Sequence, residues 1–189
     1  MAKTGITEKR LANKRFKKTE EAILRIFFEE KDYISIGKMA ERAGVARSTV
    51  YKHHRTVWNI ALDYENYILA KYKTAIGQPN KLKYAKLKNL YRGTLVFVLQ
   101  NRQIFKVFIK SGRRDVFEKM IFLLKLKIES ASGLPKNSGR VFKIYTSEVV
   151  TLLVEWGLGE FQDNEMEKLL VNILYLTETM RARLVPLLN

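Results

Sequence analysis

The chain has 189 residues, 47% of them hydrophobic, and its 35 Lys and Arg outnumber 19 Asp and Glu for a net charge of +16. This apolar fraction excludes a disordered chain, and the absence of cysteine excludes disulfides and thiolate metal sites. The two histidines are adjacent, so we expect no histidine-based metal site. No cofactor is expected either.

Helical periodicity dominates the first part of the chain. Thr19 is placed to cap a helix that has one apolar face and ends near residue 31. Ser35 is placed to cap a second, short helix, and a third is predicted from about 47 to 53. A long helix follows over residues 56–76.

The remainder of the chain is also helical in pattern. Helices are predicted over residues 83–109, 117–130, 141–158 and 164–187, with a loop over 132–139. No strand hairpin, repeat or low-complexity tract interrupts them. We therefore expect an all-α fold.

The segment Ala43-Gly44-Val45-Ala46 between the two short helices is typical of a helix-turn-helix. Glycine at the turn permits a left-handed backbone conformation. A small core of Met39, Ala40, Val45 and Val50 would fix the two helices against each other. The second helix then presents donors and an aromatic hydroxyl suited to base edges and phosphates in a major groove. They belong to Arg47, Ser48, Thr49, Tyr51, Lys52 and His53.

The stretch 19–69, with its Ala-Gly-Val turn and its Arg-Ser-Thr-Val-Tyr helix followed by Lys-His, resembles the DNA-binding domain of TetR-type transcriptional regulators. The resemblance implies contacts to bases or adjacent phosphates from Arg47, Ser48 and Thr49, and contacts to the DNA backbone from Tyr51, Lys52 and His53. The predicted DNA-binding set further contains Lys17, Lys18, Ser35 and Arg55. The family usually has phenylalanine where this chain has His54, and often has a capping serine where it has Ala46, a poor cap.

The second part of the chain resembles the regulatory domain of the dihydroxyacetone-kinase-regulator type within this family. The resemblance is carried by residues 100–105 with Gly112 and Phe117, and by Trp156-Gly157-Leu158 followed by 164–167. It implies an effector, either a small molecule or a partner protein. We expect a basic N-terminal arm over 1–18, a helix-turn-helix domain over 19–60 and an effector-binding and dimerisation domain over 61–189.

Aromatic residues at helical spacing in this second domain are more often core than cavity lining. A ligand cavity nevertheless needs a few polar groups that converge within an apolar wall. The candidate effector pocket consists of Tyr91, Arg92, Thr94, Phe97, Gln100, Asn101 and Phe105.

The last two helices carry more apolar positions than one core-facing stripe requires. Pairing with their copies in a four-helix bundle would make a homodimer, whereas the alternative is burial within one chain. A twofold dimer also suits DNA, since paired recognition helices would lie one helical turn, ~34–36 Å, apart. The candidate interface consists of Val149, Leu153, Trp156, Leu170, Ile173 and Leu174.

Positive charge is unevenly distributed along the sequence. Residues 73–143 carry 17 basic and 3 acidic side chains, a net charge of +14, whereas residues 144–189 carry a net charge of −4. The basic segment has three interpretations, a solvated surface, a site for an anionic ligand or additional DNA contact, and we favour the first with long-range steering of DNA.

These features predict a homodimeric, effector-responsive repressor that binds palindromic operators in double-stranded DNA. The alternative is a basic architectural DNA-binding protein with weak sequence preference and no effector. An enzyme is not expected, because the sequence has no metal-ligand spacing, no nucleophile with its base and no glycine-rich phosphate loop. With no apolar signal segment and no apolar run of membrane-spanning length, we expect a cytoplasmic protein.

Overall fold

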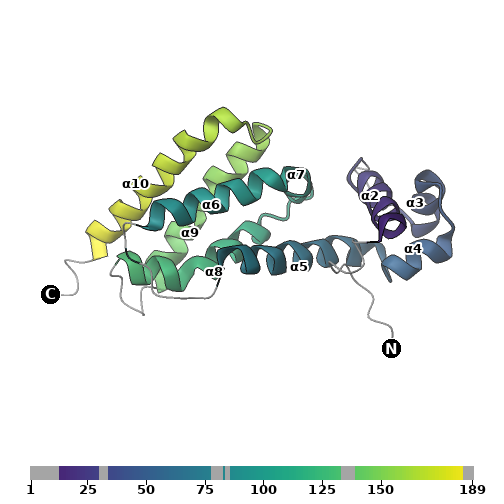
Figure 1. Ribbon diagram of the computed structural model, residues 1–189, viewed down its shortest axis with the longest axis horizontal. Coiled ribbons are helices and arrows are strands. Elements are labelled where there is room, and N and C mark those ends of the chain that lie inside the picture. The colour runs from purple at the N-terminus through teal and green to yellow at the C-terminus, as the bar shows by residue number, and fades with distance from the viewer. Residues whose placement is uncertain (1–12, 30–33, 78–82, 84–85, 133–138, 185–189) are drawn as a thin grey trace. The chain divides into compact units, whose positions relative to one another are not determined.

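The structure is a computed structural model that describes residues 13–29, 34–77, 83, 86–132 and 139–184. These residues form nine α-helices and one short 3₁₀ helix, with no strand among them (Figure 1), so the all-α prediction is confirmed. No helix in these ranges combines the length and the apolar character needed to cross a bilayer.

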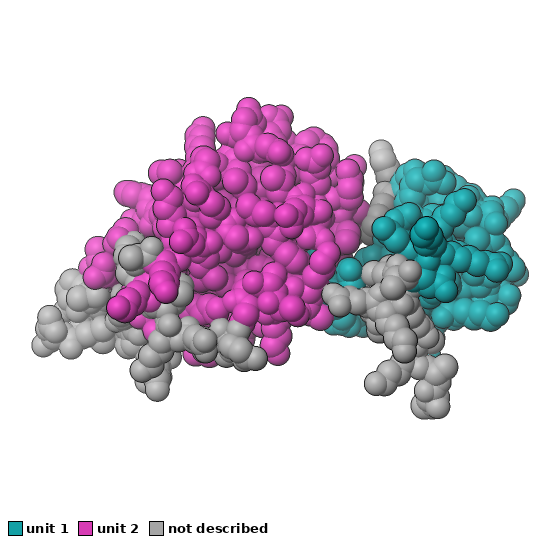
Figure 2. All heavy atoms as spheres, viewed as in Figure 1, with its two compact units in different colours: residues 1–68 teal, residues 69–189 magenta. Residues whose placement is uncertain are grey.

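The helices in chain order are α2 (Lys14–Glu29), α3 (Ile36–Ala43), α4 (Arg47–His53), α5 (Val57–Ile76), α6 (Leu87–Gln100), α7 (Arg102–Lys110), α8 (Asp115–Ser132), α9 (Gly139–Leu158), the 3₁₀ helix η2 (Asp163–Glu165) and α10 (Met166–Leu184). The chain divides into two compact units, residues 1–68 (unit 1) and 69–189 (unit 2), coloured separately in Figure 2. The division falls inside α5, eight positions after the domain boundary expected at residue 60.

Helix α2 begins earlier than the sequence indicated. Asn13, not Thr19, caps it, because the Asn13 side-chain oxygen accepts hydrogen bonds from the backbone N–H groups of Arg15 (3.0 Å) and Phe16 (3.1 Å). Thr19 instead lies within the helix, where its hydroxyl bonds the carbonyl oxygen of Arg15. Residues 14–18 of the predicted arm are therefore helical, and residues 1–12 lie outside the described part of the chain.

The helix predicted over residues 83–109 is two helices, α6 and α7, separated at Asn101. The Asn101 side-chain amide donates to the carbonyl oxygen of Phe97 at 2.7 Å, and the backbone at Asn101 leaves helical geometry (φ −113°, ψ 21°). A short polar side chain that bonds the preceding turn competes with helix continuation, which explains the break.

The core of unit 1 is formed by apolar faces of α2, α3, α4 and α5. Helix α3 packs against both α2 and α4. The buried side chains of this core include Ile23, Ile26, Met39, Ala40, Val50, Ile60 and Ile68. In unit 2, α9 packs against α7, α8 and α10, and α10 also packs against α6.

The residues predicted for the dimer interface lie mainly in the core of unit 2. Five of them are at most 4% exposed in the single chain, and Leu174 is half-buried. The five are Val149, Leu153, Trp156, Leu170 and Ile173. They cannot present a surface to a second copy, so their assignment to an interface is corrected to core. Helices α9 and α10 each contact two or more neighbours within unit 2, which explains why their apolar positions exceed a single stripe.

Candidate nucleic-acid interface

The connection between α3 and α4 has the conformation that the sequence predicted. Gly44 is left-handed (φ 64°, ψ 34°), and the backbone N–H groups of Gly44 and Val45 bond carbonyl oxygens in the last turn of α3. Met39, Ala40 and Val50 are fully buried beside it, and Val45 is half-buried. The turn and this small core hold the two short helices together.

The two helices are capped differently. The Ser35 hydroxyl accepts a hydrogen bond from the backbone N–H of Lys38 at 3.3 Å, so Ser35, which we expected in the DNA-binding set, is the N-cap of α3. Ala46 precedes α4 and offers no side-chain cap. Helix α4 therefore lacks the ~1 kcal/mol that a capping serine typically contributes.

Most of the predicted contact residues lie together on the exposed side of α4. Arg47, Ser48 and Lys52 are exposed, Tyr51 is 52% exposed, and Thr49 is half-buried. Arg55 is exposed just after the helix, and Lys17 and Lys18 are exposed on α2. Lys17 also faces Glu21 one turn on, at 3.8 Å.

The Arg47 side chain lies across the first turn of α3. A Cβ atom added at Gly37 would come within 2.6 Å of the Arg47 guanidinium. Glycine at position 37 thus leaves the space in which the guanidinium rests. This relation crosses from one helix to the next, and no pattern in the sequence indicated it.

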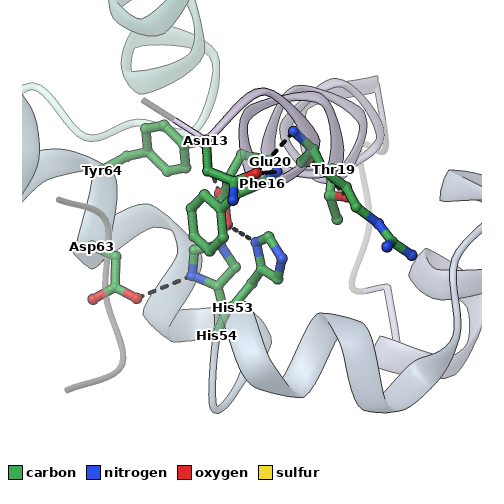
Figure 3. A network of polar contacts seen from close by, with 9 residues as sticks. Asn13, Phe16, Thr19, Glu20, His53, His54, Asp63 and Tyr64 are labelled. Atoms are coloured by element: carbon green, nitrogen blue, oxygen red, sulfur yellow. Dashed lines mark hydrogen bonds and ion pairs between the residues drawn. The ribbon is translucent and has the colours of Figure 1, made fainter. Parts of the chain in front are cut away.

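His53 is the clear exception in the predicted set. It is 6% exposed, its Nδ1 bonds the buried carboxylate of Glu20, and its ring stacks on Phe16 with centroids 4.0 Å apart (Figure 3). The prediction that His53 contacts the DNA backbone is therefore wrong, since the end of α4 turns this side chain into the core of unit 1.

His54 and its neighbours complete a buried polar cluster, which we call the Glu20 cluster: Glu20, His53, His54, Asp63 and Tyr64. The His54 nitrogens Nε2 and Nδ1 lie 3.1 Å from Glu20 Oε2 and 3.0 Å from Asp63 Oδ2 (Figure 3). Tyr64 donates its hydroxyl hydrogen to Glu20 Oε2 at 2.9 Å. Both carboxylate oxygens of Glu20 are thus satisfied by donors.

The geometry of His54 defines its charge. A neutral imidazole has one N–H and one lone pair, and a lone pair facing a carboxylate would be repelled. Because both ring nitrogens face carboxylates, His54 donates from both and carries a positive charge. Burial alone lowers the pKa of His54, but its bonds to Glu20 and Asp63 outweigh burial and raise this pKa above its ordinary value of 6.5.

Glu20 is the matching anion. Burial alone raises the pKa of its carboxyl, but hydrogen bonds from His53 and His54 outweigh burial and lower the pKa from 4.5 to about 2. For Tyr64, burial and the charge of Glu20 raise the pKa, so its hydroxyl stays protonated and donates. At a pH between the pKa values of Glu20 and His54, the cluster therefore contains a Glu20 carboxylate and a His54 imidazolium that are hydrogen-bonded to each other.

The Glu20 cluster connects three helices within unit 1. Glu20 lies on α2, the two histidines end α4, and Asp63 and Tyr64 lie on α5. The bonds of His53 and His54 to Glu20 hold the end of α4 against α2, and the bond between His54 and Asp63 holds it against α5. No three such side chains in the described ranges are arranged as a metal site, and the ring nitrogens and carboxylates here are already bonded to one another.

One member of the cluster left a signal in the sequence. Glu20 is in phase with the apolar face of its helix, three and seven positions before Ile23 and Phe27. A carboxylate on a buried face needs a partner. The partner could not be identified from the sequence, because His53 is 33 positions away.

The side chains predicted to form an effector pocket do not form one. Phe97 and Phe105 are core residues, and Tyr91 and Thr94 are buried and hydrogen-bonded to Tyr145 and Tyr72. The other three are elsewhere engaged or exposed: Arg92 pairs with Glu167 at 2.7 Å, Asn101 ends α6, and Gln100 is exposed. The candidate pocket is therefore reassigned to packed core and surface.

Comparison of the chain with protein-family models, with curated proteins and with solved structures gave no match in any of the three.

Proposed function

We propose that this protein is a sequence-specific DNA-binding regulator of transcription, a homodimeric repressor in which α3, Gly44 and α4 form a helix-turn-helix. One observation carries the proposal. Helix α4 exposes Arg47, Ser48 and Lys52 to solvent, and its C-terminal end is held in the core of unit 1 by the Glu20 cluster. The resemblance of residues 19–69 to TetR-type regulators supports the same function.

Base reading is assigned to the first turn of α4 and phosphate contact to the residues around it. An arginine can bond guanine through two donors at once, which distinguishes bases, whereas lysine and tyrosine position the helix on the backbone. Arg47 therefore carries specificity, and Tyr51, Lys52 and Arg55 carry affinity that is less dependent on sequence.

Dimerisation is assigned to the exposed sides of the last two helices, since their buried sides are occupied. On α10, Val171 is 62% and Tyr175 is 70% exposed, and the two lie one turn apart. On α9, Ile144 and Leu158 are 60% and 66% exposed. In sedimentation velocity, the wild-type protein is expected to sediment as a dimer, and the pair Val171→Glu and Tyr175→Glu, which introduces charge on this surface, is expected to yield a monomer.

The deciding experiment measures binding to the DNA flanking the protein's own gene and to a scrambled duplex at ~150 mM salt. A preference of roughly 10³-fold or more for the native fragment establishes sequence-specific binding. Arg47→Ala is expected to weaken binding to the preferred fragment by ~1–3 kcal/mol, with little effect on scrambled DNA.

Arg140→Ala is the matched control, because Arg140 is an exposed arginine on α9 and its loss changes net charge equally. Equal losses from Arg47→Ala on both duplexes would contradict the base-reading role of Arg47.

A basic architectural protein is the second candidate, favoured by the net charge of +14 over residues 73–143. It predicts equal affinity for native and scrambled duplexes and a steep loss of affinity with added salt. That result would replace the proposal of a regulator.

A further inference from the structure

Unit 2 contains a groove where faces of α5, α8 and α9 meet. Its volume of about 760 Å³ is within the range of roughly 300–1,000 Å³ typical of small-molecule sites. Its apolar lining includes Leu69 of α5, Phe122 and Leu123 of α8, and Phe142 of α9. None of the residues predicted from the sequence as an effector pocket lines it.

The apolar lining is accessible to a ligand. Phe122 is 65% exposed, although burial of a phenylalanine side chain is energetically favourable. It lines the groove instead of lying on a convex surface. Phe142, by contrast, is 4% exposed and forms part of the floor. The groove can therefore cover the apolar body of a bound molecule on several sides.

The polar lining is predominantly cationic. Glu118 is the one carboxylate among the described residues that line the groove. The lining lysines are Lys73, Lys119, Lys125 and Lys143.

The four lysines differ in their partners. Lys119 pairs with Asp115 at 2.7 Å, and Lys125 faces Glu129 at 3.7 Å. Lys73 on α5 and Lys143 on α9 are exposed, and neither has a carboxylate partner in the part of the chain that the structure describes.

We propose that this groove binds a small amphipathic anion, a carboxylate on an elongated apolar body such as a medium-chain fatty acid. Lys73 and Lys143 meet the carboxylate, and Phe122, Leu123 and Phe142 cover the apolar chain. Charge complementarity selects this occupant: a cationic amphiphile would meet uncompensated ammonium groups, and a purely polar anion would leave the apolar lining in water. Only the further role of this site as the effector site depends on the proposed regulation of transcription.

The test is isothermal titration of the full chain with decanoate, and with decyltrimethylammonium as a probe of equal chain length and opposite charge. Decanoate is expected to bind with a stoichiometry of one per chain and at least tenfold more tightly than the cation. Equal affinities would overturn the proposal, because apolar burial without charge recognition would then account for binding.

Two variants locate the site. The pair Lys73→Glu and Lys143→Glu is expected to weaken decanoate binding at least tenfold. The matched pair Lys88→Glu and Lys168→Glu, exposed on α6 and α10, makes the same change in net charge and is expected to leave binding unchanged. Ser147→Trp fills the groove from an exposed position on α9 without a change in charge and is expected to abolish binding.

Three further outcomes would overturn the proposal: undiminished binding by Ser147→Trp, equal losses in the two charge-reversed pairs, or self-association of the wild-type chain that Ser147→Trp abolishes. The last outcome would assign the groove to a second copy of the chain. None of these measurements includes DNA, so failure to bind decanoate is distinguishable from failure to bind an operator. If both proposals hold, decanoate changes operator affinity in the wild-type protein and not in Ser147→Trp.

Discussion

Both units bury polar side chains, but the chemistry of the two buried groups differs. In unit 1 the Glu20 cluster combines carboxylates with a charged imidazole. In unit 2 the corresponding cluster consists of three hydroxyls. The hydroxyl oxygens of Tyr91 and Tyr145 lie 2.6 Å apart, and the hydroxyl oxygen of Thr177 lies 3.2 Å from each. Burial raises the pKa of Tyr145 to about 12, so the Tyr145 hydroxyl stays neutral over the pH range in which the Glu20 cluster titrates.

The difference indicates what each group contributes. A buried charge requires every partner to be in place, so it fixes one arrangement of the helices that supply them. The loss of one hydrogen bond between neutral hydroxyls costs less stability than the loss of a partner of a buried charge. Unit 1, which contains the short helices α3 and α4, contains the charged group. The predictions below follow this contrast in order of expected effect.

The largest effect is expected from Glu20→Ala. Removal of this carboxylate leaves the charged His54 with Asp63 alone and leaves His53 and Tyr64 without their acceptor. Breaking a buried ion pair typically costs about 3–5 kcal/mol. We expect this loss in the free energy of unfolding of unit 1, measured by hydrogen exchange of peptides from residues 47–68 in the full chain.

Glu21→Ala is the control for Glu20→Ala, because the Glu21 side chain is 63% exposed and forms a surface ion pair with Lys17. A change within about 0.5 kcal/mol is expected there. If the two substitutions cost the same, the Glu20 cluster does not stabilise unit 1 as described.

Dependence of stability on pH is the next largest effect and is specific to unit 1. The pKa of Glu20 is lower in the fold than its ordinary value of 4.5, so its contribution is present above about pH 4.5 and is lost as the pH falls toward 2. A decrease of this size corresponds to about 3 kcal/mol. The pKa of His54 is raised above 6.5, so its contribution is present below that pH and is lost as the pH rises through the folded pKa.

Unit 1 is therefore expected to be most stable between about pH 4.5 and 6.5 and to lose stability on both sides. The measurement is the urea midpoint of the hydrogen-exchange protection of residues 47–68 at several pH values. Peptides from α9 are the internal reference, since the hydroxyl group of unit 2 stays neutral throughout. An equal pH response in α9 would remove the contrast between the units.

Tyr145→Phe probes the hydroxyl group with a smaller expected effect. It removes one hydroxyl bonded to Tyr91 and Thr177, and each of these retains its bond to the other. A loss of about 1–2 kcal/mol is expected in unit 2, independent of pH between about 4 and 9. Thermal unfolding checks it, with Thr151→Val as the control, because Thr151 carries an exposed hydroxyl on α9. A cost equal to that of Glu20→Ala would show that charge is not what separates the two groups.

The sequence predicts features that depend on neighbouring residues and misses those that depend on distant ones. The turn at Gly44 and the helix α4 were predicted because both depend on residues close together in the sequence. The partner of Glu20 and the break at Asn101 were not, because the first lies 33 positions away and the second depends on one side-chain bond within an otherwise helical pattern. The burial of Val149 and Trp156 within one chain could not be predicted either, because the helices that pack around α9 are determined by the tertiary fold.

Gly37→Ala has the smallest expected effect on stability and separates packing from recognition. Alanine is the better helix former by about 0.5–1 kcal/mol, and the atoms that its Cβ would meet belong to the mobile end of Arg47. Stability should therefore stay level or rise, while the guanidinium is displaced from α3 and operator affinity falls several-fold. Gly93→Ala is the control, because Gly93 lies on α6 with no atom within 4 Å of an added Cβ. It should gain similar stability and leave operator affinity unchanged. A loss of affinity in Gly37→Ala alone, measured beside an unchanged or raised midpoint of unfolding, would show that the position of Arg47, rather than the stability of the helix pair, determines binding.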